Sequence, residues 1–333
     1  MAEESEIFGI SSKAEFEIRC LETFCYQYEY CPQYRAYSEV LGISPENVTF
    51  DLIPFLPIRF FKQYEIISKG YRKISGDPVV FSSSSTTGMV PSKHVVLDIS
   101  LYEAAFTNAF RHFYGDAKDY VILALLPAYL ERKGSSLVYM ADRLIRDSGS
   151  PESGFFLYDH DRLHSVLSAM KSQGRKVILL GVSFALLDFA AAYSIGENND
   201  SWLTVMETGG MKGRKEEISR TSLHDTLSAA FGLRKIHSEY GMCELLSQAY
   251  SDGDGIFRTP AWMRIIVKDM YDPFRNAPIG TKGVLNIIDL ANINSCSFIE
   301  TEDMGISYPD GSFTIEGRLP KAERRGCNML IED

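Results

Sequence analysis

A run of hydroxyl side chains leads into a glycine and a lysine near residue 90. In chain order the residues are Ser82, Ser83, Ser84, Ser85, Thr86, Thr87, Gly88 and, after a short spacer, Pro91 and Lys93. Hydroxyl and backbone N–H groups are hydrogen-bond donors that can converge on an anion, and glycine lets the backbone approach it closely. Lysine adds a positive point charge. These residue types in this order favour a phosphate-binding loop.

This loop is not a Walker A loop, because the Gly-x-x-x-x-Gly-Lys spacing and the helix that should follow are both missing. Short β-branched runs flank it at residues 78–81 and 95–97, so we expect strand, polar loop, strand. A flexible serine-rich linker has a similar composition. The loop alone does not separate these two interpretations.

Three further short patterns carry groups suited to a nucleotide. Tyr240-Gly241 combines a flat ring with a backbone that a ligand can approach, and Glu244 offers a carboxylate for Mg²⁺. Asp303 can accept hydrogen bonds from both hydroxyls of a ribose. The small residues Thr208-Gly209-Gly210 let the backbone lie flat against a planar ligand. Plain structural alternatives exist as well: a strand–helix turn at 208–210, and a solvent-exposed turn at Asp303.

Alternating apolar runs and amphipathic segments must position these groups. A continuous apolar run predicts a buried strand at 120–126, and we expect a second buried strand at 176–181 and a further strand at 202–207. Helices are predicted at 101–114, 137–147, 161–173, 184–193 and 222–231, the first beginning near Ser100 and the last ending at Gly232. Strands that alternate with helices indicate an α/β fold with largely parallel pairing. Beyond residue 256, strands at 261–268 and 283–290 alternate with turns.

The N-terminal region has a different pattern. Residues 13–41 are aromatic-rich and helical in periodicity, with a stripe that ends near Cys31-Pro32. Two prolines three residues apart make 53–62 an extended, helix-averse segment. We therefore expect layered α/β sub-domains with mixed, largely parallel sheets and a smaller β-rich C-terminal sub-domain. The expected divisions are residues 1–75, 76–255 and 256–333.

Composition narrows the class of partner. A net charge of −10 over 333 residues argues against nucleic acid, because binding its phosphates requires a basic surface. No apolar run approaches the roughly 20 residues that span a bilayer, and the acidic residues 1–6 lack the apolar core of a secretory signal. The six cysteines, at 20, 25, 31, 243, 296 and 327, form no C-x-x-C pair. We therefore expect free thiols and a cytoplasmic protein.

Taken in order, these patterns resemble the signatures of the adenylate-forming enzymes, which include acyl-CoA synthetases, the firefly luciferase type and peptide synthetase adenylation domains. The phosphate loop comes first, Tyr240-Gly-x-x-Glu second, Asp303 third and Gly317-Arg318 fourth. Cys243 and Glu302 depart from the family pattern, which usually has threonine and glycine at these positions. Four signatures in order over residues 81–318 make the resemblance specific.

Other segments resemble one branch of that superfamily, the acyl-protein synthetases of bacterial bioluminescence operons. They lie at 53–62, 130–136, 207–214 and in the terminal Arg325-Gly326-Cys327. This resemblance implies one adenylate-forming large domain over residues 1–333, without the small C-terminal lid that the superfamily usually carries.

The resemblance also implies a reaction. A long-chain fatty acid would be activated by ATP and Mg²⁺ to an acyl-adenylate, then transferred to a cysteine as a thioester for a partner such as an acyl reductase or carrier protein. The implied catalytic residues are Cys327, as the thioester nucleophile, and Lys93. The implied nucleotide-binding residues are Ser82, Ser83, Ser84, Ser85, Thr86, Thr87, Gly88, Thr208, Gly209, Gly210, Ser238, Tyr240, Gly241, Asp303 and Arg318, with Glu244 as the metal ligand.

Two alternatives stay open. A related enzyme could deliver the acyl group to coenzyme A or a carrier protein instead. The departures at Cys243 and Glu302 would also suit a degenerate nucleotide-binding scaffold. His94 and His237 flank two of the signatures, and for both we favour a packing or surface role over ligand binding.

Overall fold

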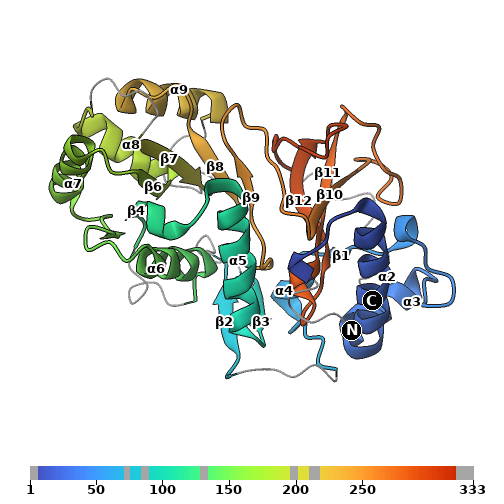
Figure 1. The fold of residues 1–333 in the computed structure, drawn as a ribbon. Helices are drawn as coiled ribbons and strands as arrows, with labels where there is room; N and C mark the ends of the chain where they lie inside the picture. The colour runs from blue at the N-terminus through green and yellow to red at the C-terminus, as the bar shows by residue number, and fades with distance from the viewer. Residues whose placement is uncertain are drawn as a thin grey trace.

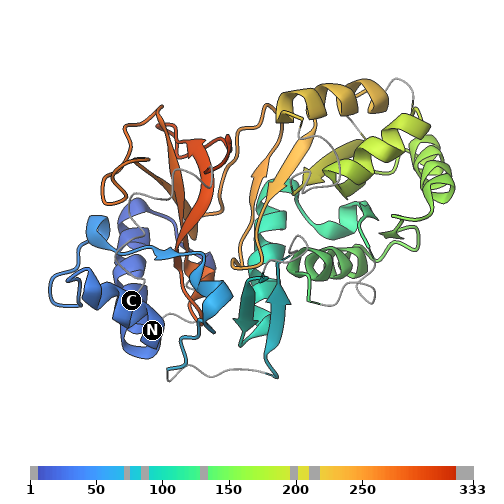
Figure 2. The ribbon, with the colours of Figure 1, turned by 180° about the vertical axis from the view of Figure 1, so that it is seen from behind.

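The computed structural model describes residues 7–70, 76–83, 90–127, 134–195, 202–209 and 218–319. Figure 1 shows two bodies side by side, each built on a β-sheet. The six-stranded sheet has the order β5-β4-β6-β7-β8-β9, and the five-stranded sheet has the order β1-β12-β11-β10 with β13 on β12. In both views the β8–β9 edge of the first sheet lies toward the second (Figures 1 and 2).

The six-stranded sheet is mostly parallel. Its strands are β4 (Val121–Leu125), β5 (Gly154–Phe155), β6 (Val177–Val182), β7 (Leu203–Thr208), β8 (His237–Tyr240) and β9 (Ala249–Ser251), of which only β9 pairs antiparallel. The three predicted strands are thus confirmed as β4, β6 and β7. The run of β4 is continuously apolar because helices cover both faces of the sheet.

Successive side chains of β4 enter different cores. Ile122 and Ala124 pack with α5 and α6, whereas Val121, Leu123 and Leu125 pack with the helices of the other face. The helices are α5 (Ile99–Tyr114), α6 (Ser136–Ser148), α7 (His160–Gln173), α8 (Ser183–Ala192) and α9 (Arg220–Phe231). All five were predicted, and the α/β fold class is confirmed.

The ends of two helices test the predicted caps. Gly232 ends α9 with a left-handed φ of 63°, as expected. The predicted start of α5 at Ser100 was wrong by two residues. Asp98 is the N-cap, and its carboxylate accepts a hydrogen bond from the Ser100 N–H at 3.1 Å.

A two-stranded hairpin carries the serine-rich segment. Its strands β2 (Val79–Ser82) and β3 (Lys93–Val96) pair antiparallel, which confirms the strands predicted on each side of the loop. Phe81 packs edge-on against the rings of Tyr102 on α5 and Tyr139 on α6, with centroids 5.3 and 5.7 Å away. These contacts seat the hairpin on the pair of helices.

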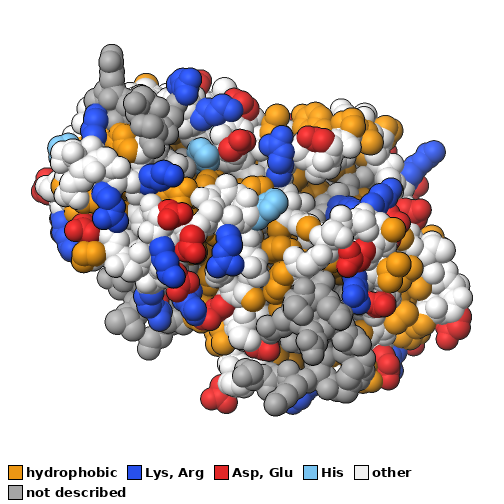
Figure 3. All heavy atoms as spheres, in the orientation of Figure 1, with side chains coloured by type: hydrophobic (Ala, Val, Ile, Leu, Met, Phe, Trp, Pro, Cys, Tyr) orange, Lys and Arg blue, Asp and Glu red, His pale blue; other side chains and the backbone are white. Residues whose placement is uncertain are grey.

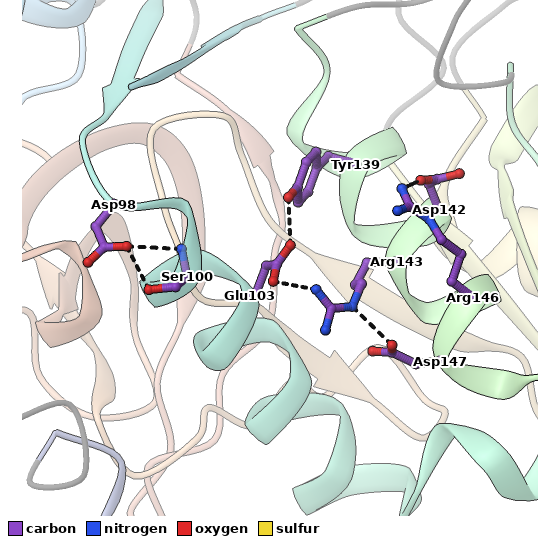
Figure 4. A network of polar contacts seen from close by, with 8 residues as sticks. All are labelled: Asp98, Ser100, Glu103, Tyr139, Asp142, Arg143, Arg146 and Asp147. Atoms are coloured by element: carbon purple, nitrogen blue, oxygen red, sulfur yellow. Dashed lines mark hydrogen bonds and ion pairs between the residues drawn. The ribbon is translucent and has the colours of Figure 1, made fainter. Parts of the chain in front are cut away.

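Polar contacts fasten α5 to α6 beside this hairpin (Figure 4). The carboxylate of Glu103 on α5 accepts a hydrogen bond from the Tyr139 hydroxyl at 2.6 Å and pairs with Arg143. Arg143 also donates to Asp147 at 2.9 Å. Arg143 therefore pairs with one carboxylate on each of the two helices.

The second body joins both ends of the described chain. Its strands are β1 (Leu56–Pro57), β10 (Met263–Lys268), β11 (Lys282–Asp289), β12 (Phe298–Ile306) and β13 (Gly317–Arg318), and its helices are α2 (Lys13–Tyr30), α3 (Pro32–Val40) and α4 (Phe60–Gln63). Short 3₁₀ turns lie at Phe50–Leu52 and Leu290–Asn292 in this body, and at Ala117–Asp119 between α5 and β4 in the first. The prediction of an extended segment over 53–62 was wrong at its end, because α4 begins at Phe60.

One buried glutamine holds α2 against this sheet. The side-chain nitrogen of Gln27 donates to the carbonyls of Asn292 and Ile293 at 3.1 and 3.0 Å. Its side-chain oxygen accepts from the Ser297 N–H at 2.9 Å. β1 adds a parallel pairing with β12, so residues before 60 and after 290 share one core.

Within the described ranges, no helix is both long enough and apolar enough to cross a bilayer. The five cysteines in those ranges are free thiols. On the face shown in Figure 3, lysine and arginine side chains lie among aspartate and glutamate side chains.

Candidate active site

Three sequence-predicted residues meet where the two bodies adjoin. Asp303 on β12 is 8% exposed. One of its carboxylate oxygens accepts a hydrogen bond from the Tyr240 hydroxyl at 2.9 Å, and the other accepts from Arg318 Nε at 3.0 Å. Tyr240 ends β8, and Arg318 lies opposite Asp303 on β13. We call Tyr240, Asp303 and Arg318 the carboxylate cluster.

A β-bulge places Asp303 in the cluster. Val284 pairs with Met304 and Asn286 with Glu300, so the three residues 301–303 of β12 lie opposite Leu285 alone. Bulges bend a strand and re-aim its side chains. The Thr301 hydroxyl closes the bulge, donating to the Leu285 carbonyl at 2.7 Å and accepting from the Asp303 N–H at 3.0 Å. Asp303 is therefore a buried strand residue, and the alternative of a solvent-exposed turn is wrong.

The cluster has a buried side and an open side. The Tyr240 ring lies 6.1 Å from the rings of both Phe257 and Phe313, and burial raises the pKa of its hydroxyl well above the ordinary value, with the Asp303 charge adding to the effect. Tyr240 therefore stays a hydrogen-bond donor. The Arg318 side chain is 66% exposed, so a ligand can reach the cluster from that side.

Glu239, which the sequence analysis did not single out, lies beside Gly241. A Cβ built on Gly241 would lie 2.5 Å from Glu239 Oε1, so the glycine makes room for this carboxyl group. We expected Gly241 to let a ligand approach the backbone closely. On the side of its missing Cβ, however, the space is occupied by the carboxyl group of Glu239. The Thr208 hydroxyl donates to the other oxygen of Glu239, which joins the ends of β7 and β8.

The environment of Glu239 favours its neutral form. Burial raises its pKa from 4.5 to about 7, the Thr208 hydrogen bond opposes this rise, and the charge of Glu207 adds to it. The only local signal in the sequence was a charged residue directly before Tyr240. A charged residue in the sequence does not by itself reveal that its carboxyl group is buried in the fold.

The predicted adenine-side residues lie on neighbouring strand ends. Ser238 on β8 is fully buried, and its hydroxyl lies 3.3 Å from His224 Nε2 on α9. Gly209 follows β7 with a φ of 69°, and its carbonyl accepts from the Ser183 hydroxyl at 2.8 Å. Thr208, Gly209 and Ser238 are thus brought together, whereas Gly210 lies outside the described residues.

Part of the serine-rich segment is described. Ser82 pairs with Lys93 across the hairpin, and the Lys93 side chain is exposed. The Ser83 hydroxyl accepts from the Ser92 N–H at 2.9 Å. The predicted residues Ser84, Ser85, Thr86, Thr87 and Gly88 lie outside the described residues, as does Cys327.

His94 connects this hairpin to the Tyr-Gly segment. It is buried, and its Nδ1 lies 2.7 Å from the carbonyl oxygen of Cys243, which requires the ring to donate. Burial lowers the pKa of His94 below its ordinary value, which favours a neutral ring. These contacts are those of the packing role that we favoured. They hold β3 against the segment that follows Tyr240. His237 also contacts protein, with its Nδ1 3.1 Å from the Tyr114 hydroxyl.

Glu244 was the predicted metal ligand. Its backbone carbonyl accepts from the Asn292 side chain at 2.8 Å. Two and three residues further on, the N–H groups of Leu246 and Ser247 donate to the Asp289 carboxylate at 2.9 Å each. No group of three histidine, cysteine or acidic residues suited to a metal occurs among the described residues. A single carboxylate on this anchored backbone fits Mg²⁺, because this ion commonly takes one or two carboxylates and completes its shell with phosphates and water.

Comparison with known proteins places the fold. No protein-family model and no curated protein matches the chain. A solved structure of 2-hydroxyisobutyryl-CoA ligase with 2-HIB-AMP and CoA, in its thioesterification state, matches 94% of this chain and 70% of that one, with 17% identity and a TM-score of 0.66. ATP-bound MatB from Rhodopseudomonas palustris matches 76% of this chain at 16% identity and a TM-score of 0.54.

The chain therefore has the fold of the adenylate-forming enzymes, as predicted. It spans about half the length of MatB, 49%, and 70% of the 2-hydroxyisobutyryl-CoA ligase.

Proposed function

We propose that this chain activates a carboxylic acid with ATP and transfers the resulting acyl group to a thiol. In the first step a carboxylate oxygen attacks the α-phosphorus of ATP and pyrophosphate leaves. In the second step a thiolate sulfur attacks the acyl carbon, the thioester bond forms, and AMP leaves with the electron pair of the broken bond. The observation that carries this proposal is the carboxylate cluster within an adenylate-forming fold.

The carboxylate cluster has enough free hydrogen-bond acceptor sites for a ribose. A carboxylate offers about four acceptor sites, and Asp303 uses one for Tyr240 and one for Arg318. The remaining sites can accept the two ribose hydroxyls, and Arg318 can also contact phosphate. The other proposed nucleotide-binding residues are Ser82 to Gly88 with Lys93 for the phosphates, and Thr208, Gly209, Gly210 and Ser238, together with Tyr240, for the adenine. Gly241 would let the backbone approach the nucleotide.

Mg²⁺ would be held by Glu244 and the ATP phosphates, where its charge would offset that of the pyrophosphate leaving group. The protein groups do the positioning. His94 holds the hairpin against the Cys243 carbonyl, and Asp289 on β11 holds the N–H groups of Leu246 and Ser247.

For the acyl group and its acceptor we extend the proposal to a long-chain fatty acid and to the Cys327 thiol, which would pass the acyl group to a partner protein. The support is the resemblance of the sequence to the acyl-protein synthetases. Thiolate is the nucleophilic form of cysteine, and the neighbouring Arg324 and Arg325 would favour it. Coenzyme A is the second candidate acceptor, favoured by the similar ligase structure that contains CoA.

The test combines pyrophosphate release with intact mass. Wild-type protein, Cys327→Ser and the matched control Cys25→Ser are incubated with Mg-ATP and a panel of carboxylic acids. An acyl mass increment in wild type and Cys25→Ser, lost with neutral hydroxylamine and absent in Cys327→Ser, would establish self-acylation.

The remaining outcomes separate the alternatives. Pyrophosphate release that rises when coenzyme A is added, with no protein adduct, would assign the acceptor to coenzyme A. Nucleotide binding without pyrophosphate release for any acid would refute the proposed enzyme and favour a scaffold.

A further inference from the structure

One arginine side chain contacts both bodies of the molecule. Arg220 begins α9 in the first body, and its Nε lies 3.4 Å from Oε1 of Glu207 on β7. Its Nη1 donates to the carbonyl of Ile315 at 3.2 Å, and Ile315 lies between β12 and β13 in the second body. The planar guanidinium group presents its donors in a fixed fork, so one side chain can hold both acceptors at a set separation.

The Glu207 end of this contact lies among the predicted adenine-side residues. The Glu207 side chain is 5% exposed, and it directly precedes Thr208 on β7. Its Oε1 also lies 3.6 Å from His224 Nε2, and that nitrogen is 3.3 Å from the Ser238 hydroxyl. The Ser183 hydroxyl donates to the other carboxylate oxygen at 3.4 Å. The carboxylate that receives Arg220 is therefore fixed within the first body.

The Ile315 end lies on the segment that carries Arg318. The N–H groups of Thr314 and Glu316 donate to carbonyls of β12 at 2.9 and 2.7 Å. Because the backbone groups of successive strand residues alternate in direction, the Ile315 carbonyl points away from β12. Arg220 supplies the donor on that side, three residues before Arg318.

An aromatic layer supports the arginine. Its guanidinium carbon lies 5.0 Å from the centroid of the Phe257 ring. Phe257 and Phe313 are both fully buried and exchange two backbone hydrogen bonds, at 2.7 and 3.0 Å. Each of these two rings lies 6.1 Å from the Tyr240 ring. Arg220 therefore packs on the aromatic residues that back the carboxylate cluster.

The residues proposed to bind ATP are divided between the two bodies. The adenine side belongs to the first body, whereas Asp303 and Arg318 belong to the second, so one nucleotide can meet both only at a fixed separation. We propose that Glu207 and Arg220 form a positioning pair, which holds the β12–β13 segment against the adenine side so that Asp303 and Arg318 meet the ribose. Neither side chain of the pair needs to touch the nucleotide. This inference rests on the proposed function and adds two residues to its nucleotide site.

The test measures nucleotide affinity with and without turnover. The Kd for Mg-ATP is measured by isothermal titration calorimetry in the absence of acid, and kcat and KM are measured by pyrophosphate release. Arg220→Met and Glu207→Gln should each raise the Kd and KM for ATP about tenfold, because a charge-assisted contact is lost, and leave the KM for the acid unchanged. Arg220→Lys keeps the charge without the fork and should give a smaller increase.

A double-mutant cycle separates positioning from general destabilisation. If Arg220 acts through Arg318, adding Arg220→Met to Arg318→Ala should change the Kd for ATP by less than about twofold, because the contact it supports is already lost. Independent sites would multiply their effects instead. Glu207→Gln, which preserves the shape of the side chain, provides the same comparison in the Arg318→Ala background if Arg220→Met does not fold.

The matched control is an arginine with similar contacts elsewhere. Arg35 donates to the Tyr28 carbonyl at 2.8 Å and lies 5.8 Å from the centroid of the Tyr28 ring, within the second body, so Arg35→Met should leave the Kd for ATP unchanged. An unchanged Kd in both Arg220→Met and Glu207→Gln, or effects that multiply with Arg318→Ala, would overturn the inference while leaving acid activation intact. ATP binding without pyrophosphate release would refute the enzyme alone, since the cycle in Kd does not depend on turnover. Failure of the wild type to bind ATP would overturn both.

Discussion

Replacing Glu239 by glutamine should stabilise the protein at alkaline pH and have little effect in acid. The Glu239 side chain is 7% exposed, lies against Gly241 and accepts one hydrogen bond from Thr208. Glutamine has nearly the same shape and can accept the same bond. The substitution therefore removes one property, the ability to ionise.

The magnitude follows from the pKa. Burial raises the pKa of Glu239 from 4.5 to about 7, so ionising this group in the folded protein costs about 3 kcal/mol more than in the unfolded chain. Between these two pKa values the unfolded chain has lost the proton and the folded protein has kept it. Stability therefore falls as pH rises through this window, and the full cost is present above pH 7. Glutamine escapes this cost.

Urea unfolding followed by tryptophan fluorescence provides the assay, at pH values from 4.5 to 8. The free energy of unfolding of Glu239→Gln minus that of wild type should grow by about 3 kcal/mol across the series. The control Glu29→Gln, at an exposed position on α2, should give a constant difference. A constant difference for Glu239→Gln as well would refute the reasoning, because it would mean that Glu239 ionises as it does in water.

Three further substitutions test other contacts. Asp303→Asn should raise KM for ATP about tenfold or more in a pyrophosphate-release assay, because it removes the charge of the carboxylate cluster, while an unchanged KM would exclude a ribose contact. Gly241→Ala should cost about 1–3 kcal/mol in urea unfolding, because its Cβ would meet Glu239, and adding Glu239→Ala should recover most of that loss. His94→Leu should lower the free energy of unfolding by about 1–3 kcal/mol in the same measurement, because the buried Cys243 carbonyl loses the His94 donor. An unchanged free energy of unfolding would mean that this hydrogen bond does not stabilise the fold.

The fold was predictable where a single local property decided the structure. Apolar runs such as 121–125 and 177–182 form buried strands because each is long enough for a strand and is flanked by amphipathic helices. Gly232 ends α9 because the left-handed conformation costs glycine little. At α5 the prediction took Ser100 as the cap, whereas Asp98, two residues earlier, accepts the Ser100 N–H.

The candidate site was predictable in its residue types but not in its contacts. The motifs named Tyr240, Asp303 and Arg318, yet their meeting depends on strands that lie far apart in the sequence. The bulge at 301–303 depends on pairing with Leu285, which no window of sequence around Asp303 contains. Glu239 was missed for the same reason, since its pKa is set by what covers it.

The two departures from the family pattern bear on whether this chain could be a degenerate scaffold. At position 243 His94 takes the backbone carbonyl, a group that threonine and cysteine present alike, so the exchange leaves this link between β3 and the Tyr-Gly segment in place. At position 302 the glutamate leaves Asp303 bonded to Tyr240 and Arg318. A carboxylate cluster that keeps both of its donors can accept a ribose in an enzyme and in a nucleotide-binding scaffold alike, so release of pyrophosphate is the property that separates the two.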